Sequence, residues 1–214
     1  TDFVEAELKK NGVELVLGVK VESIEPGLKV NYASVKDGAK GTAEGDVVLM
    51  AGGRIPNTRS IGLETLGVKM DRKGFVEIDG LCRTNVPGVY AIGDINGKMQ
   101  LAHVASAQGL LAADHIAGKP CKQLNLNRIP SCVYCNPETA MVGLTEEQAR
   151  AAGRDVGTGV FNLSGNGKAL TMGENKGLVK FVFDKATDEI LGFHVIGPRA
   201  TDLAAEVAAV MECE

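Results

Sequence analysis

Few folds accommodate an apolar segment that ends in Gly-Asp and leads through a short loop into a long Ala-rich segment. Val86–Ile92 has the apolar composition of a strand, and Gly93 and Asp94 end it. Val104–Ala117 predicts a helix because it is rich in Ala, Leu and Gln, and Gly118 follows as a stop signal. A strand, a loop and a helix in this order are typical of α/β folds, where ligands bind beyond the carboxyl ends of the strands.

The residue types at this strand end suit a binding site. The carboxylate of Asp94 can accept hydrogen bonds from ligand hydroxyl groups, and Gly93 permits close approach of the backbone. The start of the following helix directs free amide groups and the positive end of the helix dipole toward the same place. The combination of a carboxylate that accepts from hydroxyl groups and amides that stabilise negative charge fits a flavin.

Before this stretch, the sequence predicts a β-hairpin and a buried strand. Val19–Glu25 and Leu28–Val35 flank a Pro-Gly turn, which predicts two antiparallel strands. Lys36–Gly45 is rich in Lys and Gly and predicts a loop. Asp46–Ala51 contains a continuous apolar run, as expected of a strand that is buried on both faces of a sheet.

The last third of the chain predicts an α+β region with an antiparallel sheet. Leu178–Phe183 and Ile190–Ile196 are apolar segments on either side of a polar turn, and a helix is expected from about Thr201. Ser131–Tyr134 predicts another strand, and Thr145 opens a capping-box pattern, which predicts a helix start.

Charge and apolar content exclude several classes of partner. The chain has 23 basic and 27 acidic residues, a net charge of -4 and no Lys/Arg run, which argues against nucleic acid and anionic membranes as partners. No apolar stretch approaches the roughly 20 residues that cross a bilayer, and the N-terminus has no leader pattern, so a cytoplasmic protein is expected. The five cysteines are irregularly spaced and are expected to be reduced thiols.

The stretch Arg83–Asp94 and the segment that enters the following helix resemble the second flavin-binding motif of the pyridine nucleotide-disulfide oxidoreductases. The resemblance implies that Asp94 holds the ribityl chain of FAD and that the entering segment lies against the pyrimidine side of the flavin ring. This segment consists of Gln100, Leu101, Ala102 and His103. The family usually has Met at the position of Gln100. The Leu-Ala-His ending resembles the branch of the family that oxidises dihydrolipoamide.

Other segments extend the resemblance to nearly the whole chain. Val48–Asn57 resembles the exit of the family's NAD domain, which implies that Gly53 lies against the nicotinamide nucleotide and that Val21 contacts the adenine side. Ile129–Glu146 and Gly192–Gly197 resemble the opening and the later part of the family's dimerisation domain. The resemblance implies an α/β plus α+β architecture of three regions: the tail of a Rossmann-like NAD domain (1–52), the second half of the FAD-binding or central domain (53–124) and a truncated dimerisation domain (125–214).

The resemblance also implies the function of a parent enzyme. Such an enzyme reoxidises dihydrolipoamide to lipoamide with NAD+ through FAD and a redox disulfide, and contributes to cell redox homeostasis. It is a homodimer that acts on the lipoyl domain of a 2-oxo acid dehydrogenase or glycine cleavage complex. The family's redox cysteine pair and catalytic His and Glu fall outside this sequence, whose two ends read as cut, so no catalytic residue is expected in it. Two alternatives stay open: another flavin disulfide reductase of the glutathione or mercuric reductase type, and a non-catalytic dimerisation module.

Three further features are interpreted as structural. Cys132 and Cys135 form a C-x-x-C pattern on a predicted strand, where residues three apart point to opposite faces, so neither a redox pair nor a metal site is expected. The side chain of His103 is expected to cap or pack, because the implied flavin contact is made by the backbone. The segment from Gly165 to Gly167 is expected to be a surface loop with no helix after it.

Overall fold

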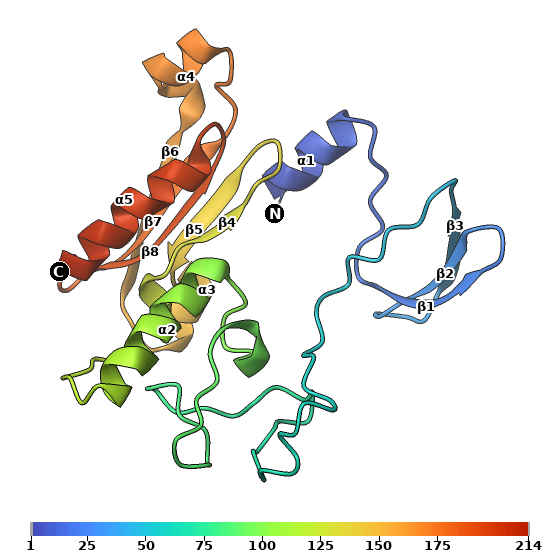
Figure 1. Cartoon of the computed structure of the whole chain (residues 1–214). Coiled ribbons are helices and arrows are strands. Elements are labelled where there is room, and N and C mark those ends of the chain that lie inside the picture. Colours follow the sequence, from blue (N-terminus) through green and yellow to red (C-terminus); the bar gives the residue numbers. More distant parts are fainter. Residues whose placement is uncertain (1, 214) are drawn as a thin grey trace. The chain divides into compact units, whose positions relative to one another are not determined.

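The structure is a computed structural model that describes residues 2–213 (Figure 1). Contacts within the chain divide it after Arg54 into two units. The first unit holds helix α1 (Asp2–Lys10) and a three-stranded antiparallel sheet. The second unit begins at Ile55 and holds a five-stranded antiparallel sheet with its helices. Among the described residues, no helix has both the length and the apolar character needed to cross a bilayer.

The sheet of the first unit contains the predicted hairpin. Strands β1 (Val19–Glu25) and β2 (Lys29–Ser34) pair antiparallel, with Glu25 opposite Lys29 at the turn. Strand β3 (Lys40–Glu44) pairs with the other edge of β2. The expectation of a loop over Lys36–Gly45 is therefore wrong for its second half. Lys40–Glu44 has little apolar alternation, but it forms a strand because hydrogen bonds to β2 satisfy its backbone amide and carbonyl groups.

The prediction of a buried strand over Asp46–Ala51 is wrong in this structure. No described residue of this segment belongs to a strand. Val47, Leu49 and Met50 are 83%, 85% and 71% exposed. A strand that is apolar on both faces needs neighbours on both sides, and the described part of the first unit supplies none for this run.

The second unit starts with a long segment held by turns and isolated bridges rather than by a sheet. The prediction of a strand over Val86–Ile92 is wrong, because this segment makes only one bridge, between Arg83 and Tyr90. The chain reverses within the segment at Gly88, whose φ is 79°, and so pairs with itself. The residues around it form a small core centred on Val68, Val76 and Ala91.

Helix α2 (Ala102–Ile116) confirms the predicted Ala-rich helix and begins slightly earlier than expected. Its buried residues recur at helical spacing and are Val104, Gln108, Leu111 and Ala112. Gly118, with a φ of 71°, follows the helix in the left-handed conformation that only glycine adopts without strain.

The predicted antiparallel sheet of the last third is confirmed, with strand order β4-β5-β8-β7-β6. Helix α5 (Ala200–Cys213) lies along the sheet (Figure 1) and packs on it through a core that includes Val142, Phe193 and Val195. The short 3-10 helix η2 (Leu126–Arg128) precedes the sheet. The strands are β4 (Ser131–Val133), β5 (Thr139–Gly143), β6 (Val156–Asn162), β7 (Leu178–Asp184) and β8 (Ile190–Ile196).

Two short helices complete the second unit. The capping box of α3 (Glu146–Ala151) is confirmed, because the side chain of Thr145 accepts from the Gln148 amide and that of Gln148 accepts from the Thr145 amide. The segment 165–167 is at the surface as expected, with Gly165 and Gly167 exposed, but the prediction of a loop with no helix after it is wrong. The 3-10 helix η3 (Leu163–Gly165) leads into helix α4 (Gly167–Met172), and the Asn166 side chain caps α4 by accepting from the Ala169 amide.

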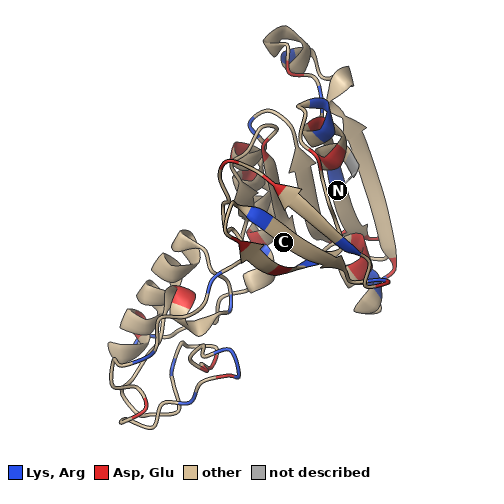
Figure 2. Cartoon of the chain, turned by 90° about the vertical axis from the view of Figure 1, so that its right-hand side faces the viewer, with Lys and Arg blue, Asp and Glu red and all other residues tan. Residues whose placement is uncertain are grey.

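Acidic and basic residues are interspersed along the chain (Figure 2). A partly buried ion pair joins Arg154 to Asp184, with 2.7 Å between Nε and Oδ2, and Asp184 is 6% exposed. The guanidinium of Arg154 also pairs with Glu189. The Ala186 amide and then the Arg154 guanidinium hold the pKa of the Asp184 carboxyl below its ordinary value.

We therefore expect Asp184 to contribute to the acid sensitivity of the fold. Because its pKa is lower in the folded than in the unfolded chain, its carboxylate stabilises the fold above about pH 4 and loses this contribution as the pH falls through the folded pKa. Asp184→Asn should lower the midpoint of thermal unfolding at neutral pH and flatten its fall below about pH 4. Asp188→Asn is the control, since Asp188 is exposed in the same turn. Equal pH profiles for Asp184→Asn and the wild type would contradict the assignment.

Candidate flavin site

The Gly93-Asp94 turn forms a 3-10 helix, η1 (Gly93–Asn96), that lies directly against α2. Gly93 is buried with a φ of 74°, and a Cβ atom built on it would lie 3.0 Å from the Cβ of Ala105. The backbone conformation therefore favours glycine strongly here, and the tight space beside Ala105 adds to that preference. Asp94 follows in the first turn of η1 and is exposed.

A buried amide network joins this turn to the helix. Gln108 on α2 is 3% exposed, and its Oε1 accepts from the Gly93 amide at 2.7 Å and from Asn96 Nδ2 at 2.9 Å. Asn96 is 4% exposed and also donates from Nδ2 to the Ala91 carbonyl at 3.2 Å. Neither side chain was predicted from the sequence. A glutamine among the apolar residues on the buried face of α2 was the available signal.

The start of α2 has no side-chain cap. Leu101 is the N-cap residue in an extended conformation and makes no capping bond, so the first-turn amides, including those of Ala102 and His103, lack an intrahelical acceptor. Gln100 and Leu101 are half-buried, whereas Ala102 and His103 are exposed. The Nε2 of His103 lies 2.9 Å from the Pro130 carbonyl oxygen, so its ring packs against the segment that leads into β4.

These residues have the donors and acceptors that a flavin needs. An exposed carboxylate suits the hydroxyl groups of a ribityl chain, and uncapped helix amides suit the electron-rich edge of the ring system. Gly93 keeps the turn that carries Asp94 in contact with the helix that carries the amides. The residues present therefore fit one half of a flavin site.

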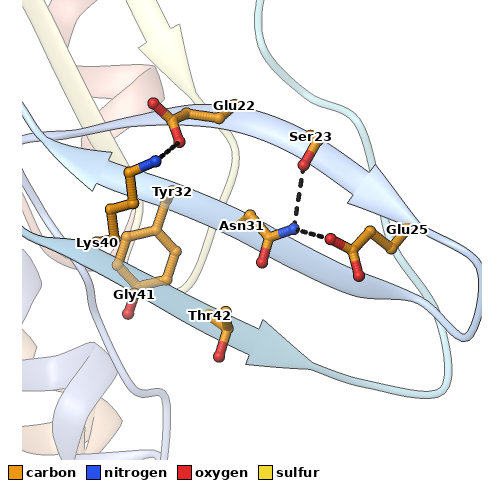
Figure 3. A pocket seen from close by; sticks show the side chains of 8 residues that line it. All are labelled: Glu22, Ser23, Glu25, Asn31, Tyr32, Lys40, Gly41 and Thr42. Carbon is orange, nitrogen blue, oxygen red and sulfur yellow. Dashed lines mark hydrogen bonds and ion pairs between the residues drawn. The ribbon is translucent and has the colours of Figure 1, made fainter.

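The two residues expected to contact NAD lie in the first unit. Val21 is on β1 and is 51% exposed, and Gly53 has a φ of 115° with open space around it. The hollow of about 460 Å³ on this sheet contains neither residue (Figure 3). Its polar groups satisfy one another, since Asn31 Nδ2 donates to Ser23 Oγ at 3.1 Å and to Glu25 Oε1 at 2.7 Å.

The two cysteines of the C-x-x-C pattern lie on a strand and just beyond its end. Cys132 lies on β4 and Cys135 beyond its end, and both are free cysteines. Burial raises the pKa of the Cys132 thiol, which disfavours the reactive thiolate. Within the described residues, no group of three potential ligands is arranged to hold a metal ion.

Comparison with known proteins identifies the class. The family model of the pyridine nucleotide-disulphide oxidoreductases matches residues 1–109, and the model of that family's dimerisation domain matches residues 129–214. The chain therefore belongs to the pyridine nucleotide-disulphide oxidoreductases.

Within this family, the chain is similar to dihydrolipoyl dehydrogenases. It is 41% identical to the one from Rhizobium etli over 100% of this chain and 45% of the relative, and 42% identical to the one from Cupriavidus necator over 96% and 44%. The chain thus spans a little under half the length of the curated relatives it matches.

Solved structures show the same fold. LpdA from Mycobacterium tuberculosis superposes with a TM-score of 0.86 at 30% identity, covering 98% of this chain and 45% of that one. The HOCl-induced flavoprotein disulfide reductase RclA from Escherichia coli superposes with a TM-score of 0.84 at 26% identity, covering 99% and 48%.

Proposed function

We propose that this chain is part of an FAD- and NAD-dependent oxidoreductase that oxidises dihydrolipoamide to lipoamide. The observation that carries the proposal is 41% identity to a dihydrolipoyl dehydrogenase along the whole chain, which includes the Gly93-Asp94 turn and the uncapped start of α2. The dithiol–disulfide pair and the acid–base residues of the reaction would come from outside these 214 residues.

The flavin half-site of this chain would bind through two elements. Asp94 would accept hydrogen bonds from the ribityl hydroxyl groups, and the segment of Gln100, Leu101, Ala102 and His103 would present amides to the pyrimidine side of the ring. When bound, FAD supplies the two-electron chemistry that links a thiol pair to a nicotinamide. The amides at the helix start would stabilise negative charge on the reduced ring.

The remaining assignments follow from the same proposal. Gly53 would lie against the nicotinamide nucleotide and Val21 near the adenine side. The three regions of the chain would span residues 1–52, 53–124 and 125–214. The dimerisation domain at residues 129–214 supports a homodimer. The partner in a larger assembly would be a lipoyl domain of a 2-oxo acid dehydrogenase or glycine cleavage complex, and the location would be the cytoplasm.

A second candidate is a flavin disulfide reductase with another substrate. The likeness to RclA, with a TM-score of 0.84, favours it to a lesser degree, because its 26% identity is well below the 41% identity to a dihydrolipoyl dehydrogenase. A non-catalytic dimerisation module is a third possibility for the 214-residue chain by itself, and it predicts dimers that form without flavin.

Substrate discrimination tests the proposal. The complete protein that contains this chain is supplied with NAD+ and either free dihydrolipoamide or a lipoylated protein domain, and NADH formation is followed. As a second arm, NADH or NADPH is supplied with glutathione disulfide. NADH formation from dihydrolipoamide, without comparable turnover of glutathione disulfide, is expected. The reverse preference would replace the proposal by the second candidate.

A further inference from the structure

We propose that Gln108 and Asn96 are positioning residues that set the distance between the two halves of the flavin contact, the Gly93-Asp94 turn and the start of α2. The inference rests on the proposed function, since it concerns the same cofactor. Neither side chain is placed against the flavin. Both act through the backbone that carries Asp94.

We call the hydrogen-bonded pair of Gln108 and Asn96 the clamp, because it holds both ends of η1 against α2. A single oxygen, Gln108 Oε1, accepts from the Gly93 amide at 2.7 Å and from Asn96 Nδ2 at 2.9 Å. These two donors stand at the beginning and the end of η1, so one acceptor on α2 fixes both ends of the turn. Asn96 in turn donates to the Ala91 carbonyl at 3.2 Å and thereby ties the segment before the turn.

Because the clamp is buried, loss of its hydrogen bonds is expected to cost free energy. The residues Gln108 and Asn96 are 3% and 4% exposed, and within the described part of the chain every buried side-chain nitrogen and oxygen has a hydrogen-bond partner. Without the Gln108 oxygen, the buried amide of Gly93 would have no acceptor in place, and the turn would have to move to find one. An apolar residue would suit the buried face of α2 equally well, so the amide serves the turn rather than the core.

The clamp joins the two elements that the flavin would bridge. Asp94 is covalently next to Gly93, and Gln108 belongs to the same rigid helix as the uncapped amides of residues 102 and 103. A ligand that contacts both elements is sensitive to their separation, and a displacement of about 1 Å can cost about 100-fold in function. By fixing this separation, the clamp determines whether the flavin can contact Asp94 and the helix amides at the same time.

The test compares four variants of the complete protein. Gln108→Leu removes the acceptor at similar volume, Gln108→Glu keeps an acceptor oxygen at the same place, and Leu111→Ala disturbs the next turn of the same buried face. For each variant, the dissociation constant for FAD, the visible spectrum of the bound flavin and the thermal midpoint of the apoprotein are measured. Asn96→Ala, which leaves the Gly93 bond intact, is measured in the same way.

Gln108→Leu is expected to weaken FAD binding by about 10- to 100-fold and to shift the flavin spectrum. Gln108→Glu is expected to keep both the FAD affinity and the flavin spectrum of the wild type. Leu111→Ala should lower the thermal midpoint but leave the spectrum unchanged. Should Gln108→Leu not fold, Asn96→Ala decides, with a smaller expected loss of roughly 3- to 10-fold because one of two donors is removed. FAD binding and spectra equal to the wild type in the folded variants would overturn the inference. A wild-type protein that binds no FAD would instead contradict the proposed function.

Discussion

Replacing Gly192 by Ala is expected to lower the free energy of unfolding of the second unit by about 3 kcal/mol or more. Gly192 lies in β8, between its partners Gly143 on β5 and Val182 on β7. A Cβ atom built on Gly192 would overlap the backbone carbonyl oxygen of Leu144. Because this neighbour is backbone, no rotation of a side chain can relieve the clash, and the strands themselves would have to separate.

A matched glycine in the same sheet provides the control. Gly159 on β6 has no atom within 4 Å of a built Cβ and has an ordinary extended conformation, so Gly159→Ala should change stability little. Urea unfolding followed by circular dichroism measures both variants. Similar losses for the two variants would show that packing around β8 is looser than described.

Replacing Asp94 by Ala is expected to weaken FAD binding by roughly 10- to 150-fold, since hydrogen bonds to a charged group contribute about 1.5–3 kcal/mol. Asp94 is exposed on the turn that Gly93 holds against α2. The measurement is the FAD dissociation constant of the complete protein, together with its thermal midpoint in the absence of flavin.

The comparison for Asp94 is Asp114→Asn on α2. Asp114 pairs with Lys119 at 2.7 Å on the helix that follows the proposed site, so it controls for loss of a carboxylate nearby. FAD binding should stay within about twofold of the wild type in this variant, as expected for an exposed ion pair of small energetic effect. Wild-type FAD binding by Asp94→Ala would show that Asp94 does not contact the flavin.

The sequence predicts well those elements whose signals are local. The hairpin of β7 and β8 needs only two apolar segments and a polar turn, and the capping box at Thr145 acts within one helical turn. Helix α2 follows from its composition and from the stop signal at Gly118. In each case the residues that specify the element lie close together in the sequence.

Elements that depend on distant partners were predicted poorly. Val47–Met50 has the apolar composition of a central strand, but a strand forms only where other strands pair with it. Val86–Ile92 has similar composition, yet its turn at Gly88 folds it onto itself.

The candidate site was anticipated only in part. Asp94 and the start of α2 were expected from the strand-loop-helix order and from the family resemblance. The partners of Gln108 could not be read from spacing, because its two bonds reach back to residues 93 and 96 across a loop. Buried polar networks of this kind depend on the packed arrangement rather than on any local pattern.

A visible absorption spectrum of the complete protein, recorded as purified and again after NADH is added without oxygen, tests the central claim that this chain supplies half of a flavin site in an NAD-linked oxidoreductase. The account predicts flavin bands in the purified protein that bleach when NADH is added. It also predicts that Asp94→Ala weakens or abolishes those bands. A colourless protein that takes up no added FAD, or a bound flavin that NADH leaves oxidised, would contradict it.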